Sequence, residues 1–254
     1  MISFTTDYGL SDGFVAACHG VLARLAPQAR VLDITHLIPP GDVRRGAAIL
    51  AQTVPSLPRG VHLAVVDPGV GTARRPIAIA AADGSLLVGP DNGLLVPAAV
   101  ALGGVGTAVA LTNRSWFAPQ VSHTFHGRDI FAPVAARLSE GAALLDAGEE
   151  ITDWVTLPQP YVEQTPGRLV AEVQTVDHFG NVQLAATAAA LSPIPADVAV
   201  NGAPALHTTT FGNADPNALV LLADSAGYAA VAVNGGNAAE RLALSPGDRV
   251  TITY

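Results

Sequence analysis

The sequence predicts an α/β fold in two domains, an amino-terminal α/β domain with a mostly parallel central sheet flanked by helices and a smaller all-β domain. Strand and helix patterns alternate through the first part of the chain, as in α/β proteins. From Arg168 onward the helical periodicity disappears, and short strand-like runs recur between Gly, Asn and Pro turns, which is typical of an antiparallel, barrel-like sheet. We therefore place the α/β domain at residues 1–157, a proline-containing linker at 158–167 and the β domain at 168–254.

The elements of the first domain follow from short β-branched runs and longer runs of small apolar residues. The pair Asp83-Gly84 predicts a hairpin turn between two of the strands. The expected strands are 2–6, 31–34, 61–66, 77–81, 86–88 and 108–111, and the expected helices are 13–25, 43–54, one starting at Leu94, and 127–139.

The second domain is expected to consist of short strands alone. They are predicted at 169–176, 198–200, 219–222, 229–233 and 250–253. Two domains of different architecture can offer a ligand-binding cleft where they meet.

Composition excludes several chemistries. The chain has 254 residues, of which 50% are hydrophobic, enough for a substantial core. Its 13 basic residues are all arginines, so a Schiff-base lysine, a pyridoxal-phosphate lysine and a P-loop lysine are impossible. The net charge of −8 argues against nucleic acid as the main partner.

Localisation is expected to be cytoplasmic. Cys18 is the single cysteine, so an internal disulfide is excluded, and its small-residue surroundings indicate core packing. The first residues lack the basic start and long apolar run of a signal peptide. No membrane association is expected either, because the uncharged stretch 94–111 is interrupted by Pro97 and three glycines.

The stretch with the clearest chemical meaning is 65–76, where a predicted buried strand runs into a glycine-rich loop. Asp67 follows this strand and should lie at its carboxyl end, the edge at which open α/β sheets bind ligands. Gly69 and Gly71 permit a turn with close backbone approach to a ligand. Taken alone, Asp67 also fits a purely structural turn, because Asp-Pro-Gly sequences mark turns in many proteins.

Asp7 repeats this arrangement at the end of the first predicted strand, followed by Tyr8-Gly9. A carboxylate at that edge can accept hydrogen bonds from ribose hydroxyls. Alternatively, Asp7 caps the helix that begins near Gly13. Spacing alone does not decide between ribose binding and helix capping.

His126 is the best imidazole candidate, because it lies in the dense cluster Thr124–Asp129 at the expected start of a helix. Most of the other histidines, namely His19, His36, His62, His123 and His207, lack such a setting. No two histidines have the spacing of a zinc motif such as His-Glu-x-x-His, so we expect no metal site, although ligands scattered along the chain escape this argument.

In the second domain, Asp177, Phe179 and Asn181 bring a carboxylate, an aromatic ring and a carboxamide to one sharp turn. Further along, Phe211 offers a stacking ring, Ser225 a hydroxyl, and the loop around Gly235 exposed backbone. Each of these features alone also fits ordinary turn chemistry.

The order and spacing of these motifs resemble one family, the S-adenosyl-L-methionine hydroxide adenosyltransferases, which are relatives of the fluorinase and chlorinase. The resemblance implies an α/β amino domain, a β carboxy domain and a homotrimer with sites between subunits. It spans the whole chain and rests on six stretches: Thr6–Gly9, Asp67–Pro76, Gly89–Leu95, Thr124–Phe131, Asp177–Asn181 and Val233–Ala239.

Carried over residue by residue, the resemblance assigns the hydrolytic set to Asp67, Arg74 and His126, with Arg75 as the neighbouring alternative. It also implies substrate-binding roles. Asp7 would hold the ribose; Asn181 and Phe211, with backbone near Gly235, would hold adenine; Asp177 and Ser225 would hold the methionine end, and Phe179 lies in the same turn. The sequence departs at Ala226, where the halogenases tend to carry an arginine, so the methionine carboxylate needs another partner such as backbone amides.

The function that the resemblance implies is hydrolysis of S-adenosyl-L-methionine to adenosine and methionine, without a cofactor. The carboxylate of Asp67 favours water over a halide nucleophile, because a negative charge repels a halide ion. The alternatives are a non-catalytic protein that binds adenosine or S-adenosylmethionine, a halogenase that forms 5′-halo-5′-deoxyadenosine, and a nucleoside-cleaving enzyme that releases adenine.

Overall fold

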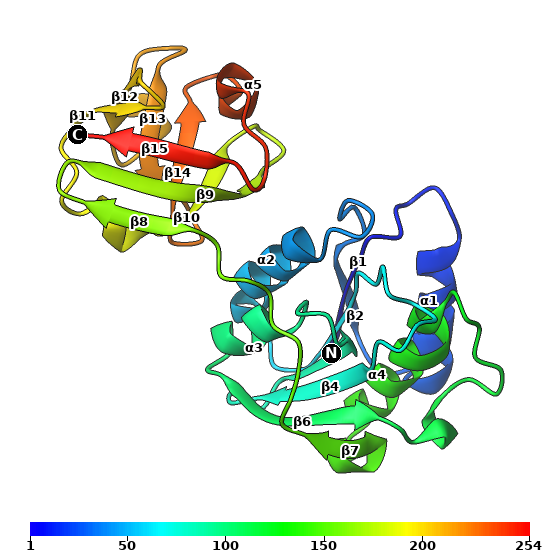
Figure 1. The fold of residues 1–254 in the computed structure, drawn as a ribbon. Coiled ribbons are helices and arrows are strands. Elements are labelled where there is room, and N and C mark those ends of the chain that lie inside the picture. Colours follow the sequence, from blue (N-terminus) through cyan, green and yellow to red (C-terminus); the bar gives the residue numbers. More distant parts are fainter. The chain divides into compact units, whose positions relative to one another are not determined.

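A seven-stranded sheet forms the centre of the first of two structural units, Met1–Leu157, in the computed structural model, which describes residues 1–254 (Figure 1). The strand order is β2-β1-β3-β5-β4-β6-β7. Strands β2, β1, β3 and β5 pair in parallel, and the remaining pairings are antiparallel, which confirms the predicted fold class. The strands are β1 (Ile2–Thr6), β2 (Val31–Thr35), β3 (Val61–Val65), β4 (Pro76–Ala81), β5 (Leu86–Pro90), β6 (Val105–Leu111) and β7 (Gly148–Ile151).

Two helices cover each face of this sheet. Helices α1 (Phe14–Leu25) and α4 (Ala132–Ser139) share one buried cluster with Leu63 and Val65 of β3. Helices α2 (Val43–Thr53) and α3 (Val96–Ala101) share another with Ala64 and Val66. Successive side chains along β3 therefore pack into the two clusters on opposite faces of the sheet, as expected of a central strand buried on both faces.

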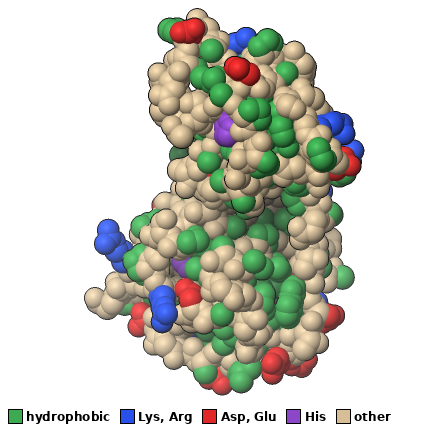
Figure 2. All heavy atoms as spheres, turned by 90° about the vertical axis from the view of Figure 1, so that its left-hand side faces the viewer, with side chains coloured by type: hydrophobic (Ala, Val, Ile, Leu, Met, Phe, Trp, Pro, Cys, Tyr) green, Lys and Arg blue, Asp and Glu red, His purple; other side chains and the backbone are tan.

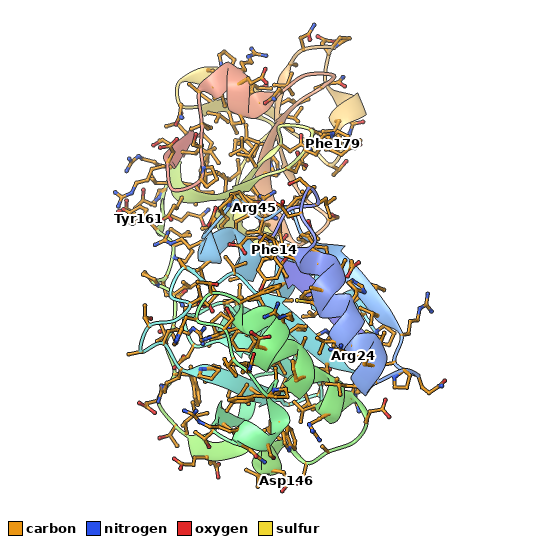
Figure 3. All side chains as sticks on the ribbon, turned by 90° about the vertical axis from the view of Figure 1, so that its right-hand side faces the viewer. Phe14, Arg24, Arg45, Asp146, Tyr161 and Phe179 are labelled. Atoms are coloured by element: carbon orange, nitrogen blue, oxygen red, sulfur yellow. The ribbon has the colours of Figure 1, made fainter.

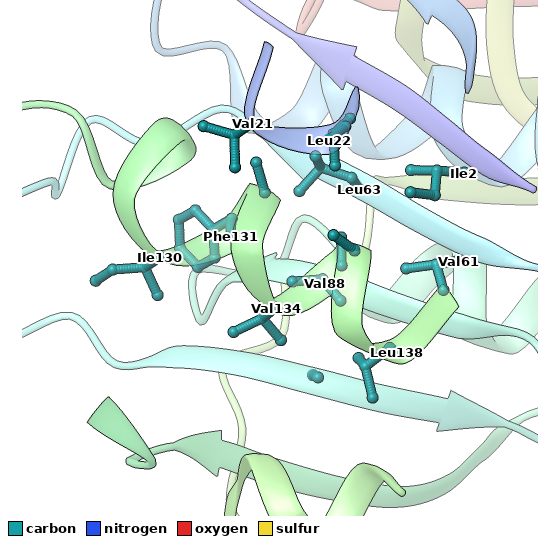
Figure 4. Packing of buried hydrophobic residues seen from close by; sticks show 14 of the residues in the cluster. Ile2, Val21, Leu22, Val61, Leu63, Val88, Ile130, Phe131, Val134 and Leu138 are labelled. Carbon is teal, nitrogen blue, oxygen red and sulfur yellow. The ribbon is translucent and has the colours of Figure 1, made fainter. Parts of the chain in front are cut away.

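The first of these clusters anchors the segment that carries His126. Phe131 is fully buried among Val21, Leu22 and Val134, which Figure 4 shows from close by. It ends a short π-helical turn, Gly127–Phe131, that runs directly into α4. The predicted helix 127–139 thus exists but is not regular in its first turn, and such π turns occur frequently at functional sites.

The edge strand β7 was not predicted. Its sequence Gly-Glu-Glu-Ile shows no alternation of apolar and polar residues, and both glutamates are exposed. Charged side chains are common on edge strands because they discourage pairing with another chain. The face drawn in Figure 2 likewise carries scattered acidic and basic side chains among uncharged ones.

The second unit, Pro158–Tyr254, is a β barrel with strand order β10-β14-β13-β12-β11-β15-β9-β8. Pairing of β9 with β10 closes it, and all pairings are antiparallel except that of β12 with β13. This confirms the predicted antiparallel, barrel-like sheet. The strands are β8 (Val162–Thr165), β9 (Arg168–Val176), β10 (Val182–Thr187), β11 (Asp197–Val200), β12 (Ala203–His207), β13 (Leu219–Ala223), β14 (Tyr228–Val233) and β15 (Arg249–Thr253).

Several elements of the barrel differ from the sequence-based expectation. Residues 162–165, which we placed in the linker, form β8 and pair with β9, although all four are exposed and carry no buried face that a pattern could reveal. Strands β10 and β12 were not predicted, nor was the single-turn helix α5 (Ala238–Leu242). None of the helices is both long and apolar enough to cross a membrane.

Candidate active site

Asp67 and Arg74 form a buried ion pair at the carboxyl end of β3. Arg74 donates from Nε to Oδ1 of Asp67 at 3.0 Å, and its Nη2 contacts Oδ2, so the pairing is bidentate. The side chain of Arg74 is only 7% exposed and that of Asp67 only 6%. A bidentate arginine–carboxylate pair fixes both groups in one geometry, so the sheet edge carries a preorganised carboxylate.

The glycine-rich loop makes this pairing possible by turning sharply. Thr72 Oγ1 donates to the carbonyl of Gly69 at 2.6 Å, which closes the turn and brings Arg74 back toward Asp67. Gly71 has a φ of +77°, and a Cβ at this position would overlap the carbonyl oxygen of His123. Both conditions require glycine.

His126 joins this pair. Its Nδ1 lies 3.1 Å from Nη2 of Arg74. Because a guanidinium can only donate, Nδ1 accepts and the ring proton of the neutral imidazole is on Nε2. Burial lowers the pKa of His126, and the positive charge of Arg74 lowers it further, against the opposing charges of Asp67 and Asp129. The ring is therefore neutral near pH 7. We refer to Asp67, Arg74 and His126, for which a catalytic role is proposed, as the catalytic cluster.

Arg74 retains one unused donor. Its Nη1 is buried and has no hydrogen-bond partner within the chain. The guanidinium also lies over the ring of Phe131, 5.3 Å from the centroid, which supports its orientation. A buried donor without a partner costs stability, so such a group commonly marks a place where a ligand or water binds.

Asp7 lies beside the catalytic cluster. Its Oδ2 accepts from the N–H of Gly41 at 2.8 Å, whereas helix α1 has Gly13 at its N-cap and no side-chain cap. The capping alternative for Asp7 is therefore wrong. Burial raises the pKa of Asp7, the Gly41 hydrogen bond opposes this rise, and the negative charge of Asp67 adds to it.

Tyr8 brings an aromatic wall to the same region. Its ring packs edge-on against Phe125 at 5.6 Å and lies 6.1 Å from Phe14, which is labelled in Figure 3. Burial raises the pKa of the Tyr8 phenol, so the hydroxyl stays protonated. That hydroxyl occupies the space where a Cβ of Gly127 would lie.

We expect Gly127→Ala to lower the free energy of unfolding by about 1–3 kcal/mol, the usual cost of overpacking a filled site. Chemical denaturation measures it. Gly20→Ala is the matched control, because it lies on α1 with open space around it and should stabilise by up to about 1 kcal/mol. Adding Tyr8→Phe to Gly127→Ala should recover part of the loss; no recovery would mean that the phenol is not the obstacle.

Arg75, the alternative to Arg74, points elsewhere. It donates to Oδ2 of Asp91 from Nε at 3.0 Å and from Nη2 at 2.7 Å, and from Nη1 to Asp153 at 3.1 Å. Asp91 also accepts from the N–H of Val155 at 2.8 Å. Arg75 therefore fastens the segment after β7 to the end of β5 and takes no part in the catalytic cluster.

The loop that presents His126 is held by a buried carboxylate that the sequence analysis did not single out. Asp129 accepts from Nε and Nη2 of Arg128 at 2.7 and 3.0 Å and from the N–H of Ser122 at 2.9 Å. The hydrogen bond from Arg128 is the main effect that lowers the pKa of Asp129, against desolvation by burial. The sequence motif His-Gly-Arg-Asp contains Arg128 and Asp129. Only the fold shows that Asp129 also accepts from Ser122 and so holds the loop in place.

In the second unit, Asp177 and Asn181 are already paired with each other. Asp177 Oδ1 accepts from the N–H groups of Phe179 and Asn181, both at 2.9 Å, and Oδ2 accepts from Nδ2 of Asn181 at 2.8 Å. This closes the turn between β9 and β10. The ring of Phe179 is left 73% exposed (Figure 3).

The other candidates of this unit lie on loops that hydrogen bonds fix to neighbouring segments. The carbonyl of Gly180 accepts from Ala239 at 3.0 Å, which ties the turn to the loop containing Gly235. Asn234 donates to the carbonyl of Ala214 at 2.8 Å, next to the 3-10 turn Phe211–Asn213. Ser225 lies in an exposed turn organised by Asp224, which accepts from Gln183 of β10 at 2.5 Å. Phe211 is 42% exposed.

The chain thus combines an α/β unit, which carries a buried ionisable cluster at its sheet edge, with a β barrel, and such clusters are typical of enzyme active sites. The model for the SAM hydroxide adenosyltransferase N-terminal domain matches residues 2–148, and that for the C-terminal domain matches residues 171–251. The chain therefore belongs to the SAM hydroxide adenosyltransferase family.

Known relatives agree with this assignment. The chain is 65% identical to the (R)-S-adenosyl-L-methionine hydrolase of Salinispora arenicola, over 99% of this chain and 97% of that protein. It is 27% identical to a fluorinase from an Actinoplanes species, over 72% of this chain and 70% of that protein. A crystal structure of an uncharacterized conserved protein from Thermotoga maritima superposes with a TM-score of 0.93 at 35% identity, covering 99% and 100% of the two chains.

Proposed function

We propose that this enzyme hydrolyses S-adenosyl-L-methionine at the ribose 5′ carbon to give adenosine, L-methionine and a proton. Membership of the family and the high identity to a protein named as such a hydrolase support the reaction. The observation that carries the proposal is the catalytic cluster itself, in which a buried carboxylate, a guanidinium with one free N–H donor group and a neutral imidazole converge.

Water is the group that needs activation in this reaction. The bond from C5′ to the sulfonium sulfur breaks with its electron pair moving to sulfur, and methionine leaves as a neutral thioether that requires no general acid. Water, in contrast, has a pKa of about 15.7 and is a poor nucleophile. The attack therefore needs a group that accepts a proton from the attacking water.

Asp67 is the proposed base, because it is the anionic member of the catalytic cluster. Arg74 holds the carboxylate through Nε and Nη2, and its Nη1, which has no partner within the chain, would donate to the developing hydroxide. His126 accepts from Nη2 and so keeps the guanidinium in this orientation. In the tautomer that this contact with Arg74 requires, the Nδ1 lone pair of His126 is already used, which favours Asp67 over His126 as the base.

General-base assistance supplies roughly two to four powers of ten in rate. Fixing water and sulfonium in line within a desolvated site contributes the larger share, as effective molarities for well-oriented reactants indicate. The reaction as proposed needs no cofactor, since S-adenosylmethionine is the substrate.

Substrate binding is assigned to the remaining candidates. Asp7 is proposed for the ribose, because the hydrogen bond from Gly41 uses Oδ2 and a carboxylate has further acceptor sites for the ribose hydroxyls. Asn181 has a second N–H and its carbonyl for the adenine edge, and the exposed ring of Phe211 is proposed to stack on the adenine. Asp177 and Ser225 are proposed for the methionine end, with Phe179 as an exposed apolar cover.

The test is product identity. Purified protein is incubated with S-adenosylmethionine, with and without added chloride, and nucleosides are separated chromatographically. Adenosine and methionine in equal amounts are expected in both conditions. Free adenine would indicate nucleoside cleavage, 5′-chloro-5′-deoxyadenosine would indicate a halogenase, and tight adenosine binding without turnover would indicate a binding protein.

A homotrimer with sites at subunit interfaces is proposed from the family resemblance. Light scattering coupled to size exclusion should give a mass of three 25.8 kDa chains that does not fall on dilution through the micromolar range. A monomer that is fully active would contradict sites shared between subunits.

A further inference from the structure

A second cluster of ionisable side chains lies on the first unit, formed by His19, Asp33 and His36. His19 comes from α1, Asp33 from β2 and His36 from the residue directly after β2. Nε2 of His19 lies 2.9 Å from Oδ1 of Asp33, and Nε2 of His36 lies 3.2 Å from the same oxygen. The three ligand atoms lie within 4.8 Å of one another.

The buried histidine of this cluster is only partly used. His36 is 4% exposed, and its Nε2 makes no hydrogen bond although Asp33 is close. Nitrogen and oxygen thus approach each other without the alignment of a donor with an acceptor. Two side chains that bind one metal ion also approach each other in this way without a hydrogen bond between them.

Side chains of β1 hold the two imidazole rings in place. Nδ1 of His36 lies 2.9 Å from Oγ1 of Thr6, and Phe4 packs edge-on against both imidazoles, at 5.8 Å from His19 and 4.8 Å from His36. Metal-bound histidines usually donate their second ring N–H to an oxygen, which fixes the tautomer and the ring orientation. Thr6 can accept that proton.

We propose that His19, Asp33 and His36 bind one divalent transition-metal ion of the zinc class. Two imidazoles and a carboxylate are a donor set that zinc prefers, and with bonds of about 2.0–2.1 Å its tetrahedral ligands lie about 3.3–3.4 Å apart. The two nitrogen–oxygen separations of 2.9 and 3.2 Å are close to that value, and the two imidazole nitrogens, which lie within 4.8 Å of each other, would adjust to it on binding. His19 and Asp33 are 35% and 43% exposed, so ion and fourth ligand enter from solvent.

Such a metal has a structural role. It cross-links α1 to the end of β2, and the carbonyl of His36 accepts from the N–H of Gly9 at 2.8 Å, so it also supports the turn that follows Asp7 and Tyr8. No metal site was predicted from the sequence because one ligand comes from α1 and the other two from the end of β2, so no single-helix spacing connects all three.

The experiment is zinc titration of the full-length, tag-free protein after chelator treatment, monitored by a chromophoric competitor, with Co²⁺ as a spectroscopic probe. We expect one Zn²⁺ per chain, a visible absorption band from four-coordinate Co²⁺, and a higher melting temperature with zinc. His19→Gln and Asp33→Asn, both at partly exposed positions, should each weaken zinc binding by at least about 100-fold.

His207→Gln is the control, because this histidine lies in the other unit, where it bonds the carbonyl of Ile194. It should bind zinc like the wild type. Wild type that binds no more zinc than His19→Gln, or that gives only the cobalt spectrum of the hydrated ion, overturns the proposal and leaves His19, Asp33 and His36 as a hydrogen-bonded group. An equal loss in His207→Gln shows adventitious binding and overturns it as well.

Discussion

Asp67→Asn is expected to lower kcat for S-adenosylmethionine hydrolysis by about 10²–10⁴-fold, the range that a positioned general base supplies. KM should change little, because Asp67 acts on water rather than on the nucleoside. Steady-state kinetics and adenosine binding by calorimetry measure the two quantities separately. A variant that loses binding and rate to the same extent would place Asp67 among the substrate ligands instead.

Stability must be measured beside the rate. Asp67→Asn leaves the guanidinium of Arg74 buried with a weaker partner, and losing one member of a buried ion pair costs up to about 3–5 kcal/mol. A circular dichroism melt shows whether the fold persists at the assay temperature. Asp153→Asn is the matched control, because it is an arginine partner in the same unit but 81% exposed, and its activity and stability should be close to wild type.

Arg74→Lys is expected to lower kcat by about 10²–10³-fold, the cost of removing a donor aimed at developing negative charge. A lysine keeps the positive charge but has a single nitrogen. It cannot bind both oxygens of Asp67 as Nε and Nη2 of Arg74 do and also supply a further donor such as Nη1. Turnover assays at saturating substrate measure the loss.

Arg75→Lys is the control for this change at the neighbouring position. Its side chain is 37% exposed and pairs with Asp91 and Asp153, so kcat should be near that of the wild type, with a modest loss of stability. If Arg75→Lys loses activity as strongly as Arg74→Lys, the assignment of the two arginines is wrong.

The α/β unit was predictable because its strands are buried on both faces. The run from Val61 to Val66 consists mainly of apolar residues, and the alternation of glycine, small and apolar residues in 13–25 and 43–54 matches helices on either side. Strands that lie at an edge or carry alanine, such as β7, β8 and β10, lack this signal. Their formation depends on partners that are distant in the sequence.

The sequence named Asp67, Arg74 and His126 together as candidates, but it did not show the contacts between them. The positions of Asp67 and Arg74 in one glycine loop suggested proximity, yet the choice of Arg74 over Arg75 depends on the turn closed by Thr72. The hydrogen bonds of Asp129 and the pairing of Asp177 with Asn181 could likewise not be predicted, because the sequence does not show which polar groups bond to each other. The same holds for His19, Asp33 and His36.

The most direct test of the proposed chemistry is hydrolysis in water enriched in ¹⁸O, followed by mass spectrometry of the products. If water attacks the ribose 5′ carbon, adenosine carries one ¹⁸O in its 5′ hydroxyl and methionine carries none. Unlabelled adenosine, or label found in a ribose released together with adenine, would contradict the attack of water at C5′ and with it the role proposed for Asp67, Arg74 and His126.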